Sequence, residues 1–189
     1  MKKLLGLLCL IFAMTGCQQP PKNAVQTPPL QDPVKRGEYL VKVAACNECH
    51  TPFKMGPKGP EPDMARMMSG HPESLVMPKP PDLGKGPWMI LSSGTNTAYA
   101  GPWGISYAIN LTPDQDTGIG IWTEDMFVKA IRTGKHFGTS RPILPPMPWQ
   151  TYSNMTDEDL KAVFAYLKSI PPIKNKIPDP VIAEPPAMP

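Results

Sequence analysis

Two thiols and an imidazole lie within five consecutive residues of this chain, in the order Cys46, Asn47, Glu48, Cys49 and His50. Thiols can pair as a disulfide, bind a soft metal ion as thiolates, or add across a carbon–carbon double bond to form thioethers. An imidazole is a common metal ligand. This spacing therefore indicates a site that holds a metal ion or a covalently attached cofactor.

The spacing C-x-x-C-H is the attachment motif for c-type haem. In that chemistry the thiols of Cys46 and Cys49 add across the two haem vinyl groups, and the imidazole of His50 binds the iron. The alternatives are a thioredoxin-like redox motif, which follows a strand, a zinc site, which needs further ligands, and a chance match. Because a helical pattern precedes the motif and His71 and His136 are isolated, the sequence predicts one covalent haem c.

Residues 1–16 have the features of an export signal, because Lys2 and Lys3 precede an apolar run of 11 residues, 4–14. A helix that spans a bilayer needs about 20 such residues. The short run is therefore predicted to be a signal peptide rather than an anchor helix.

The signal ends at residues 14–17, Met-Thr-Gly-Cys, which resemble the lipobox of bacterial lipoproteins. This resemblance implies cleavage before Cys17, a diacylglyceryl group on its thiol, and attachment to the periplasmic side of a bacterial membrane. Gln18 in place of the retention aspartate points to the outer membrane. An ordinary secretory signal with an incidental Cys17 is the alternative. Lipidation of Cys17 leaves Cys46 and Cys49 as the thiols of the exported domain.

The best candidate for a second iron ligand is Met147, which Pro145, Pro146 and Pro148 surround. A neutral thioether binds iron weakly, so the cost of ordering a flexible loop would cancel the gain. Proline fixes φ and lowers the entropy that is lost on ordering, so this loop is suited to present a sulfur atom. Three rival ligands remain: Met155, His71 and His136.

Three amphipathic segments are predicted to be helices that position these side chains. The first begins at Pro33 after the capping residue Asp32, and Gly37 on its apolar face predicts a close crossing by another helix. The second covers about 123–133 and is followed by a glycine. The third begins after Thr156, and a pair of prolines ends it.

The order of these features is similar to that of class I cytochromes c, in which a loop methionine precedes a C-terminal amphipathic helix. The residues that carry the resemblance are Cys46, Cys49, His50, Met147 and the segment TDEDLKAVFAYLKSIPP. Residues 110–114, 117–120 and 147–149 also resemble motifs of the cytochrome c subunits of bacterial membrane dehydrogenases for alcohols and sugar acids. Those subunits usually carry three haem modules, whereas this sequence has a single C-x-x-C-H.

The resemblance implies the all-α fold of class I cytochromes c, with short helices and long Pro-rich loops that wrap the haem. The expected domains are a signal peptide (1–16), a lipidated cysteine with a Pro-rich tether (17–33), a cytochrome c domain (34–172) and a Pro-rich C-terminal segment (173–189). Within the domain, residues 51–104 are expected to form an extended loop insertion.

Three further residues are candidates for contact with the haem. By its distance from Met147 along the chain, Trp122 resembles the tryptophan that donates to a haem propionate in class I cytochromes c. Ordinary core packing of Trp122 is the alternative. Asn110 and Thr112 are expected near a propionate, and a turn before Pro113 explains these two residues equally well.

Composition and charge narrow the class of protein. Proline accounts for 27 of the 189 residues, which argues against a coiled coil, a long-helix bundle and a continuous central sheet. Removal of Lys2 and Lys3 lowers the formal net charge from +3 to +1, and no block of basic residues is present. No nucleic-acid partner is therefore expected.

These features predict an exported electron carrier rather than an enzyme. With His50 and Met147 on the iron, no position is left for a substrate, and the expected partners are redox proteins, namely a dehydrogenase donor and an oxidase or cytochrome acceptor. The first alternative is a peroxidase-like or gas-binding haem protein with an open or labile sixth iron position. The second is a lipoprotein in which the motif binds zinc.

Overall fold

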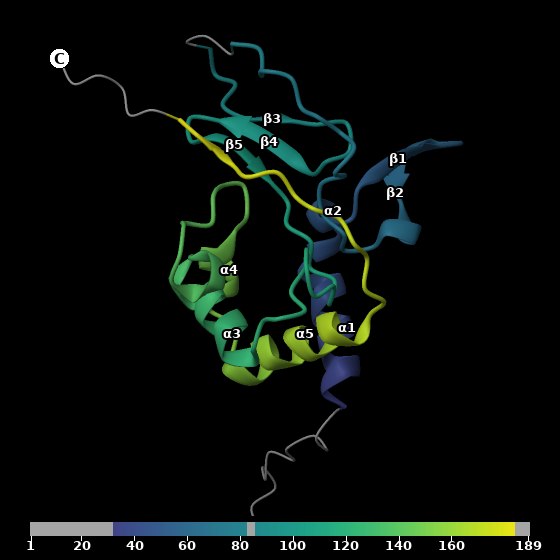
Figure 1. The fold of residues 1–189 in the computed structure, drawn as a ribbon, viewed down its shortest axis with the longest axis vertical. Helices are drawn as coiled ribbons and strands as arrows, with labels where there is room; N and C mark the ends of the chain where they lie inside the picture. The colour runs from purple at the N-terminus through teal and green to yellow at the C-terminus, as the bar shows by residue number, and fades with distance from the viewer. Residues whose placement is uncertain (1–31, 83–85, 184–189) are drawn as a thin grey trace, which may run out of the picture.

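The computed structural model describes residues 32–82 and 86–183, and Figure 1 shows their arrangement. The predicted signal peptide, Cys17 and nearly all of the predicted tether lie outside the described residues, as do residues 184–189. Among the described residues, no helix is long and apolar enough to cross a bilayer.

Three of the helices lie where the sequence predicts them, and the predicted caps Asp32 and Thr156 are confirmed. The side chains of Asp32, Thr123 and Thr156 each accept a hydrogen bond from a backbone N–H of the first turn that follows. The helices are α1 (Pro33–Val43), α2 (Cys46–His50), α3 (Glu124–Thr133), α4 (Trp149–Tyr152) and α5 (Asp157–Ser169). In Figure 1, α1, α3 and α5 lie together in the lower part of the molecule.

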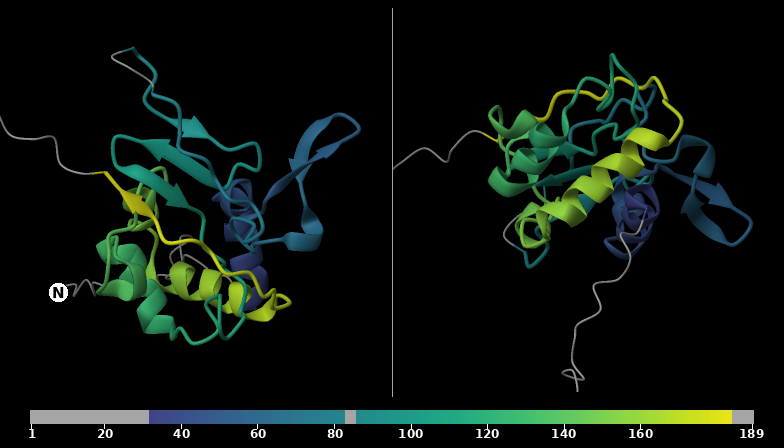
Figure 2. Two further views of the ribbon diagram at one scale, coloured as in Figure 1. Left: turned by 45° about the horizontal axis from the view of Figure 1, so that its top comes forward. Right: turned by 90° about the horizontal axis from the view of Figure 1, so that it is seen from below.

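Helices α1 and α5 cross at a close approach, as the prediction for Gly37 requires. A Cβ atom at Gly37 would lie 1.9 Å from the carbonyl oxygen of Ala162 and 2.8 Å from Cβ of Tyr166. Only glycine fits such a crossing without a shift of one helix. The right-hand view in Figure 2 shows α5 lying across the axis of α1.

The prediction of an all-α fold was wrong, because the described residues contain two antiparallel sheets. A two-stranded sheet joins β1 and β2, and a four-stranded sheet has the order β3-β4-β5-β6. The strands are β1 (Phe53–Gly56), β2 (Gly59–Pro62), β3 (Leu91–Ser92), β4 (Ala98–Gly101), β5 (Gly104–Tyr107) and β6 (Val181–Ile182). The described residues therefore form a mixed fold of helices and antiparallel sheets.

The segment 51–104, expected to be an extended loop, contains the four strands β1 to β4 and the first residue of β5. Buried backbone N–H and C=O groups need partners, and short antiparallel ladders supply them in a segment too rich in proline for a helix. Pro60 and Pro62 are tolerated in β2 because this strand is the edge of a hairpin. Within the insertion, Met64–Arg66 form a single 3₁₀ turn.

The C-terminal segment 171–183, called the strap below, lies against the body of the molecule. It runs from the end of α5 to the sheet, where β6 pairs with β5 (Figures 1 and 2). Asn175 is the buried residue of the strap, and its side-chain amide donates to the backbone oxygens of Ser69 (2.7 Å) and His71 (2.8 Å). The strap thereby connects the end of α5 with the insertion and with the four-stranded sheet.

Candidate cofactor site

A large cavity lies between the helices and the four-stranded sheet. It encloses about 1250 Å³ of space, part of which is open to solvent. Most of its walls are apolar side chains from both halves of the molecule, among them Leu111, Ile119, Phe127, Ile131, Leu160 and Leu167. A concave, mostly apolar site with a few polar groups is typical of a site for a small molecule or cofactor.

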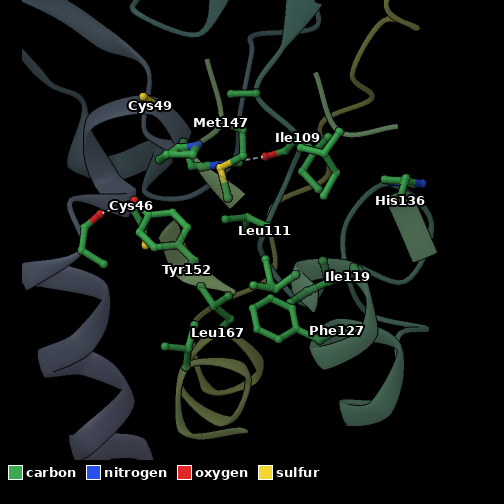
Figure 3. A pocket seen from close by; sticks show the side chains of 18 of the residues that line it. Cys46, Cys49, Ile109, Leu111, Ile119, Phe127, His136, Met147, Tyr152 and Leu167 are labelled. Atoms are coloured by element: carbon green, nitrogen blue, oxygen red, sulfur yellow. Dashed lines mark hydrogen bonds between the residues drawn. The ribbon is translucent and has the colours of Figure 1, made fainter. Parts of the chain in front are cut away.

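Helix α2 presents both thiols and the imidazole of the motif to this cavity. Residues three and four apart share one face of a helix, so Cys46, Cys49 and His50 line the same wall. Both cysteines are free thiols, and burial raises the pKa of the Cys46 thiol to about 11, which keeps it protonated at neutral pH. Figure 3 shows both cysteines on one side of the cavity.

The imidazole of His50 is held in one tautomer by a backbone carbonyl. Its Nδ1–H donates to the oxygen of Ile109 at 2.9 Å, because a carbonyl oxygen can only accept. The proton on Nδ1 leaves the lone pair of Nε2 for a metal ion. Burial also lowers the pKa of His50, which favours the neutral imidazole that a metal needs.

The insertion holds the motif in place through backbone contacts. Gly70 N–H donates to the His50 carbonyl oxygen (2.8 Å), and the side-chain amide of Asn96 donates to the Glu48 carbonyl oxygen (2.6 Å). Asn96 has a φ of +54°, so it lies in the left-handed region that asparagine tolerates. These contacts give the segments between the strands of the insertion a direct role in positioning α2, which carries His50.

Met147 reaches the cavity from a different element, the Pro-rich loop before α4. Its side chain lines the cavity and projects into it, as Figure 3 shows. The loop is fixed at its start by the N–H of Ile143, which donates to the Gly134 oxygen at 2.7 Å, and the Trp149 N–H donates to the Met147 oxygen at 2.9 Å. The motif and the predicted second ligand therefore share one cavity.

The three rival ligands have different surroundings. Met155 and His136 also line the cavity. His71 is fully buried elsewhere, and both of its ring nitrogens are engaged, with the hydroxyl of Thr97 (3.0 Å) and the carbonyl oxygen of Leu75 (2.8 Å). His71 therefore has no lone pair directed at the cavity.

Trp122 lies where the apolar cavity meets a second, polar pocket of about 780 Å³, and His136 and Arg141 line both pockets as well. The rings of Trp122 and His136 pack edge to face, with centroids 5.3 Å apart. Among the described residues, the indole N–H, the ring nitrogens of His136 and the Arg141 guanidinium have no hydrogen-bond partner. These unpaired groups all lie at the boundary between the two pockets, where the described residues offer them no hydrogen-bond acceptor.

The charges at this boundary favour an anionic group. Burial lowers the pKa of Arg141, while the charge of Asp179 acts in the opposite direction. Burial, and then the charge of Arg141, lowers the pKa of His136 to about 4. A half-buried guanidinium without an ion-pair partner is costly unless a negative group is bound beside it.

Asn110 and Thr112 are buried, and their polar atoms bond to each other and to the strap. The Asn110 amide donates to the Ile173 oxygen (2.8 Å), and its oxygen accepts from the Thr112 N–H (3.0 Å) and hydroxyl (2.7 Å). Asn110 also lines the polar pocket. Their contacts thus attach the strap at the turn before Pro113.

Sequence reasoning missed several residues of the cavity wall, among them Tyr99, Ser106 and Arg141. Tyr99 and Ser106 face each other across β4 and β5, and burial raises the pKa of Tyr99. The signal for this hairpin was present, because residues 98–107 place a Gly-Pro-Trp-Gly turn between two short apolar runs. Arg141 directly precedes the Pro-rich loop, and no sequence motif around it indicates a role in the cavity.

The donor set of the cavity fits a covalently attached haem. It has two thiols on one wall, an imidazole with a free Nε2, a thioether, and unpaired donors where an acidic edge would lie. A zinc site fits less well, because no group of three or more converging His, Cys, Asp or Glu side chains is present in residues 32–82 and 86–183.

Comparison with known proteins points to the same cofactor. No protein-family model matches the chain. The gluconate 2-dehydrogenase cytochrome c subunit of Pantoea cypripedii is 33% identical over 135 residues, which are 70% of this chain and 22% of that protein. The fructose dehydrogenase cytochrome subunit of Gluconobacter japonicus is 27% identical over 158 residues, 84% of this chain and 25% of that protein.

A third relative is the cytochrome c subunit of the quinone alcohol dehydrogenase of Gluconobacter oxydans (strain 621H). It is 29% identical over 156 residues, which are 77% of this chain and 24% of that protein. The chain spans about a quarter of the length of each of these relatives. By these similarities, the chain is a homologue of dehydrogenase cytochrome c subunits and has the features of one c-type cytochrome module of such a subunit.

Proposed function

We propose that this chain is an exported c-type cytochrome that carries single electrons through one covalently bound haem with His50 and Met147 as iron ligands. The observation that supports this most strongly is the cavity itself. Its walls bring together Cys46, Cys49, the free Nε2 of His50 and the Met147 thioether, which the sequence separates by up to a hundred residues.

The haem supplies an iron that cycles between the ferric and ferrous states, and the protein sets how readily it does so. His50 and Met147 would both hold the iron, so substrate chemistry at the iron is not expected. The apolar walls exclude water from the cavity and disfavour the extra charge of the ferric form. Thioether ligation and burial thus both act to raise the reduction potential.

Trp122, His136 and Arg141 are the residues that we assign to the haem propionates. A carboxylate at this boundary would give each unpaired donor an acceptor and would compensate the buried charge of Arg141. The polar pocket beyond them, whose wall includes Asp179 of the strap, gives the acidic edge a route to solvent. The loss of this anchor is expected to leave the covalent attachment and the iron ligands in place and to change the reduction potential.

The location and partners belong to the same proposal. Lipidation of Cys17 would hold the domain on the periplasmic side of a membrane, by a tether of about 16 residues that reaches roughly 20–50 Å. The named relatives are subunits of dehydrogenases, so a dehydrogenase is the proposed electron donor. A second cytochrome or an oxidase is the proposed acceptor.

The test is to produce the full chain in a host that attaches c-type haem and to examine Met147→Ala beside Met155→Ala. The wild type is expected to retain haem after denaturation, by mass, and to show a low-spin spectrum with the weak near-red iron–sulfur band. Met147→Ala should lose this band, and Met155→Ala, the matched cavity methionine, should keep it. High-spin ferric haem in the wild type would contradict the carrier function and favour an open sixth position.

The lipid anchor is tested separately by a Cys17→Ser variant. The mass of the mature wild-type protein should include the diacylglyceryl group, and the protein should sediment with membranes. The variant should appear as an unlipidated, soluble protein with an unchanged haem spectrum. Equal masses apart from the substitution would show that Cys17 is not modified.

A further inference from the structure

The loop that carries Met147 has an unusually small number of backbone donors. Four of the seven residues in 142–148 are proline, so the N–H groups of Ile143, Leu144 and Met147 are the only ones in the loop. A segment with so few donors is held mainly through its carbonyl oxygens. A carbonyl that is shielded from water needs a donor from another element.

The described contacts leave the middle of the loop with one such donor. Its ends are held by Ile143, which bonds to Gly134, and by Trp149, which bonds to Met147. Between them, the Ser106 hydroxyl donates to the Pro145 carbonyl oxygen at 2.6 Å. Among the described residues, this is the single hydrogen bond to the backbone of residues 144–146.

Ser106 is itself oriented for this contact. It is buried, with 8% of its surface exposed, on strand β5 in the cavity wall. The indole N–H of Trp103 donates to the Ser106 oxygen at 3.3 Å. Because the hydroxyl oxygen accepts from Trp103, its one hydrogen is directed to the Pro145 carbonyl.

The same chain segment also reaches the other side of the cavity. Ile109, two residues after the end of β5, supplies the carbonyl that orients His50. Residues 104–109 therefore contact the motif through Ile109 and the Pro-rich loop through Ser106. Strand β5 and the two residues that follow it thus connect the surroundings of His50 with those of Met147.

We propose that Ser106 is a positioning residue for Met147, which it acts on through the Pro145 carbonyl. The proposal rests on the proposed function, since it takes Met147 as an iron ligand. Without the hydroxyl, the loop would leave the iron more often, and an external ligand would find the sixth position free for a larger fraction of time. Apparent affinity for such a ligand scales with that fraction.

The experiment measures imidazole binding to the ferric full-length protein for Ser106→Ala, Ser106→Thr and Ser169→Ala. Loss of one buried hydrogen bond is expected to tighten imidazole binding about fivefold in Ser106→Ala. Ser106→Thr keeps the hydroxyl and should restore the wild-type affinity. Ser169→Ala is the matched control, because its hydroxyl makes a similar bond to the Tyr166 carbonyl oxygen on α5, outside the cavity wall.

A second readout does not depend on the iron. Hydrogen exchange at the amides of Leu144 and Met147 should be faster in Ser106→Ala than in the wild type, while exchange within α5 should be unchanged. A general loss of stability would instead raise exchange in both places. Trp103→Phe, which removes the donor to Ser106 but keeps the hydroxyl, should give an imidazole affinity between those of wild type and Ser106→Ala.

The outcomes separate this inference from the function on which it rests. The role of Ser106 alone would be overturned if Ser106→Ala stayed within twofold of the wild type in imidazole affinity and in hydrogen exchange of the loop amides. This conclusion requires that Met147→Ala loses the iron–sulfur band. If Met147→Ala leaves the spectrum unchanged, Met147 is not a ligand and both proposals fail. If Ser106→Ala does not fold, failure of Ser106→Thr to reproduce wild-type affinity overturns the positioning role.

Discussion

The two walls of the cavity are built by different kinds of interaction. The helical wall, from α1, α3 and α5, is made by packing of apolar side chains such as Leu160 and Leu167. The other wall belongs to the half of the molecule that contains the insertion, the four-stranded sheet and the strap, and this half is held together largely by hydrogen bonds from single polar side chains to backbone oxygens. The first wall supplies the volume of the site, and the second fixes the groups that point into it.

This difference predicts two kinds of failure. A change in the helical wall should lower the stability of the whole domain, because close-packed helices adjust poorly to added volume. A change in the hydrogen-bonded wall should leave a folded domain whose site groups are less well held. Substitutions in each wall test this distinction.

The largest effect is expected at the crossing of α1 and α5. Gly37→Ala would place a Cβ atom 1.9 Å from the Ala162 oxygen, so the helices must separate, at a cost of about 3 kcal/mol. Urea denaturation gives the free energy of unfolding. Gly94→Ala is the matched control, because a Cβ there meets nothing within 4 Å. Equal stabilities of the two variants would refute the close crossing.

A smaller effect is expected for the strap. Asn175→Ala removes the donors to Ser69 and His71 and the acceptor of the Glu73 N–H (2.9 Å), at a cost of about 2 kcal/mol. Limited proteolysis should cut the strap in this variant while α5 stays protected. Asn154→Ala removes an exposed side-chain amide that donates to the Gln150 oxygen of α4, and this variant should behave as the wild type. A strap resistant to protease in both would contradict its attachment by Asn175.

The hydrogen-bonded wall should also respond to pH through His71. Burial lowers the pKa of His71 in the folded state, so between its unfolded value of about 6.5 and the lower folded value the unfolded chain binds more protons. Stability is therefore complete above about pH 6.5 and is lost as the pH falls, by at most about 1.4 kcal/mol per pH unit. His71→Gln should show a shallower slope of unfolding free energy against pH, and an unchanged slope would refute this assignment.

The smallest effect is expected at the contact between the insertion and α2. Asn96→Gly removes the bond to the Glu48 oxygen but keeps a residue suited to the positive φ, whereas Asn96→Ala loses both. The alanine variant should be less stable than the glycine variant by about 1 kcal/mol. Thermal denaturation compares them, and an alanine variant as stable as the glycine variant would argue against the left-handed conformation.

The helical wall was accessible from the sequence, and the other wall was not. The side chains that cap helices are of types that the sequence shows directly: Asp32, Thr123 and Thr156. The apolar periodicity of α5 extends over three turns. These are local signals, so the caps of α1 and α5 were predicted at the residues where they occur, whereas Thr123, which the prediction placed inside the second helix, is the cap of α3. The glycine at 37 even indicated which helix face is crossed.

The strands escaped prediction because they are two to four residues long, too short for an alternating pattern. Proline also misled the fold class, since Pro60 and Pro62 argue against a central strand but fit the edge strand β2. The contacts of Asn175 and Ser106 join residues 39 to 106 positions apart, and no local pattern encodes them. Cavity residues were therefore predicted best where a motif, such as C-x-x-C-H, carried its own spacing.

The strap also has a consequence for the order in which the domain assembles. Asn175 meets Ser69 and His71 across more than a hundred residues, and β6 leaves the ribosome after the other strands of the described residues. Closing so long a loop is entropically costly, so these contacts are expected to form late in folding. Until then the polar pocket lacks the part of its wall that residues 176–179 supply. A bulky cofactor would thus have its widest route into the cavity in the incompletely folded chain.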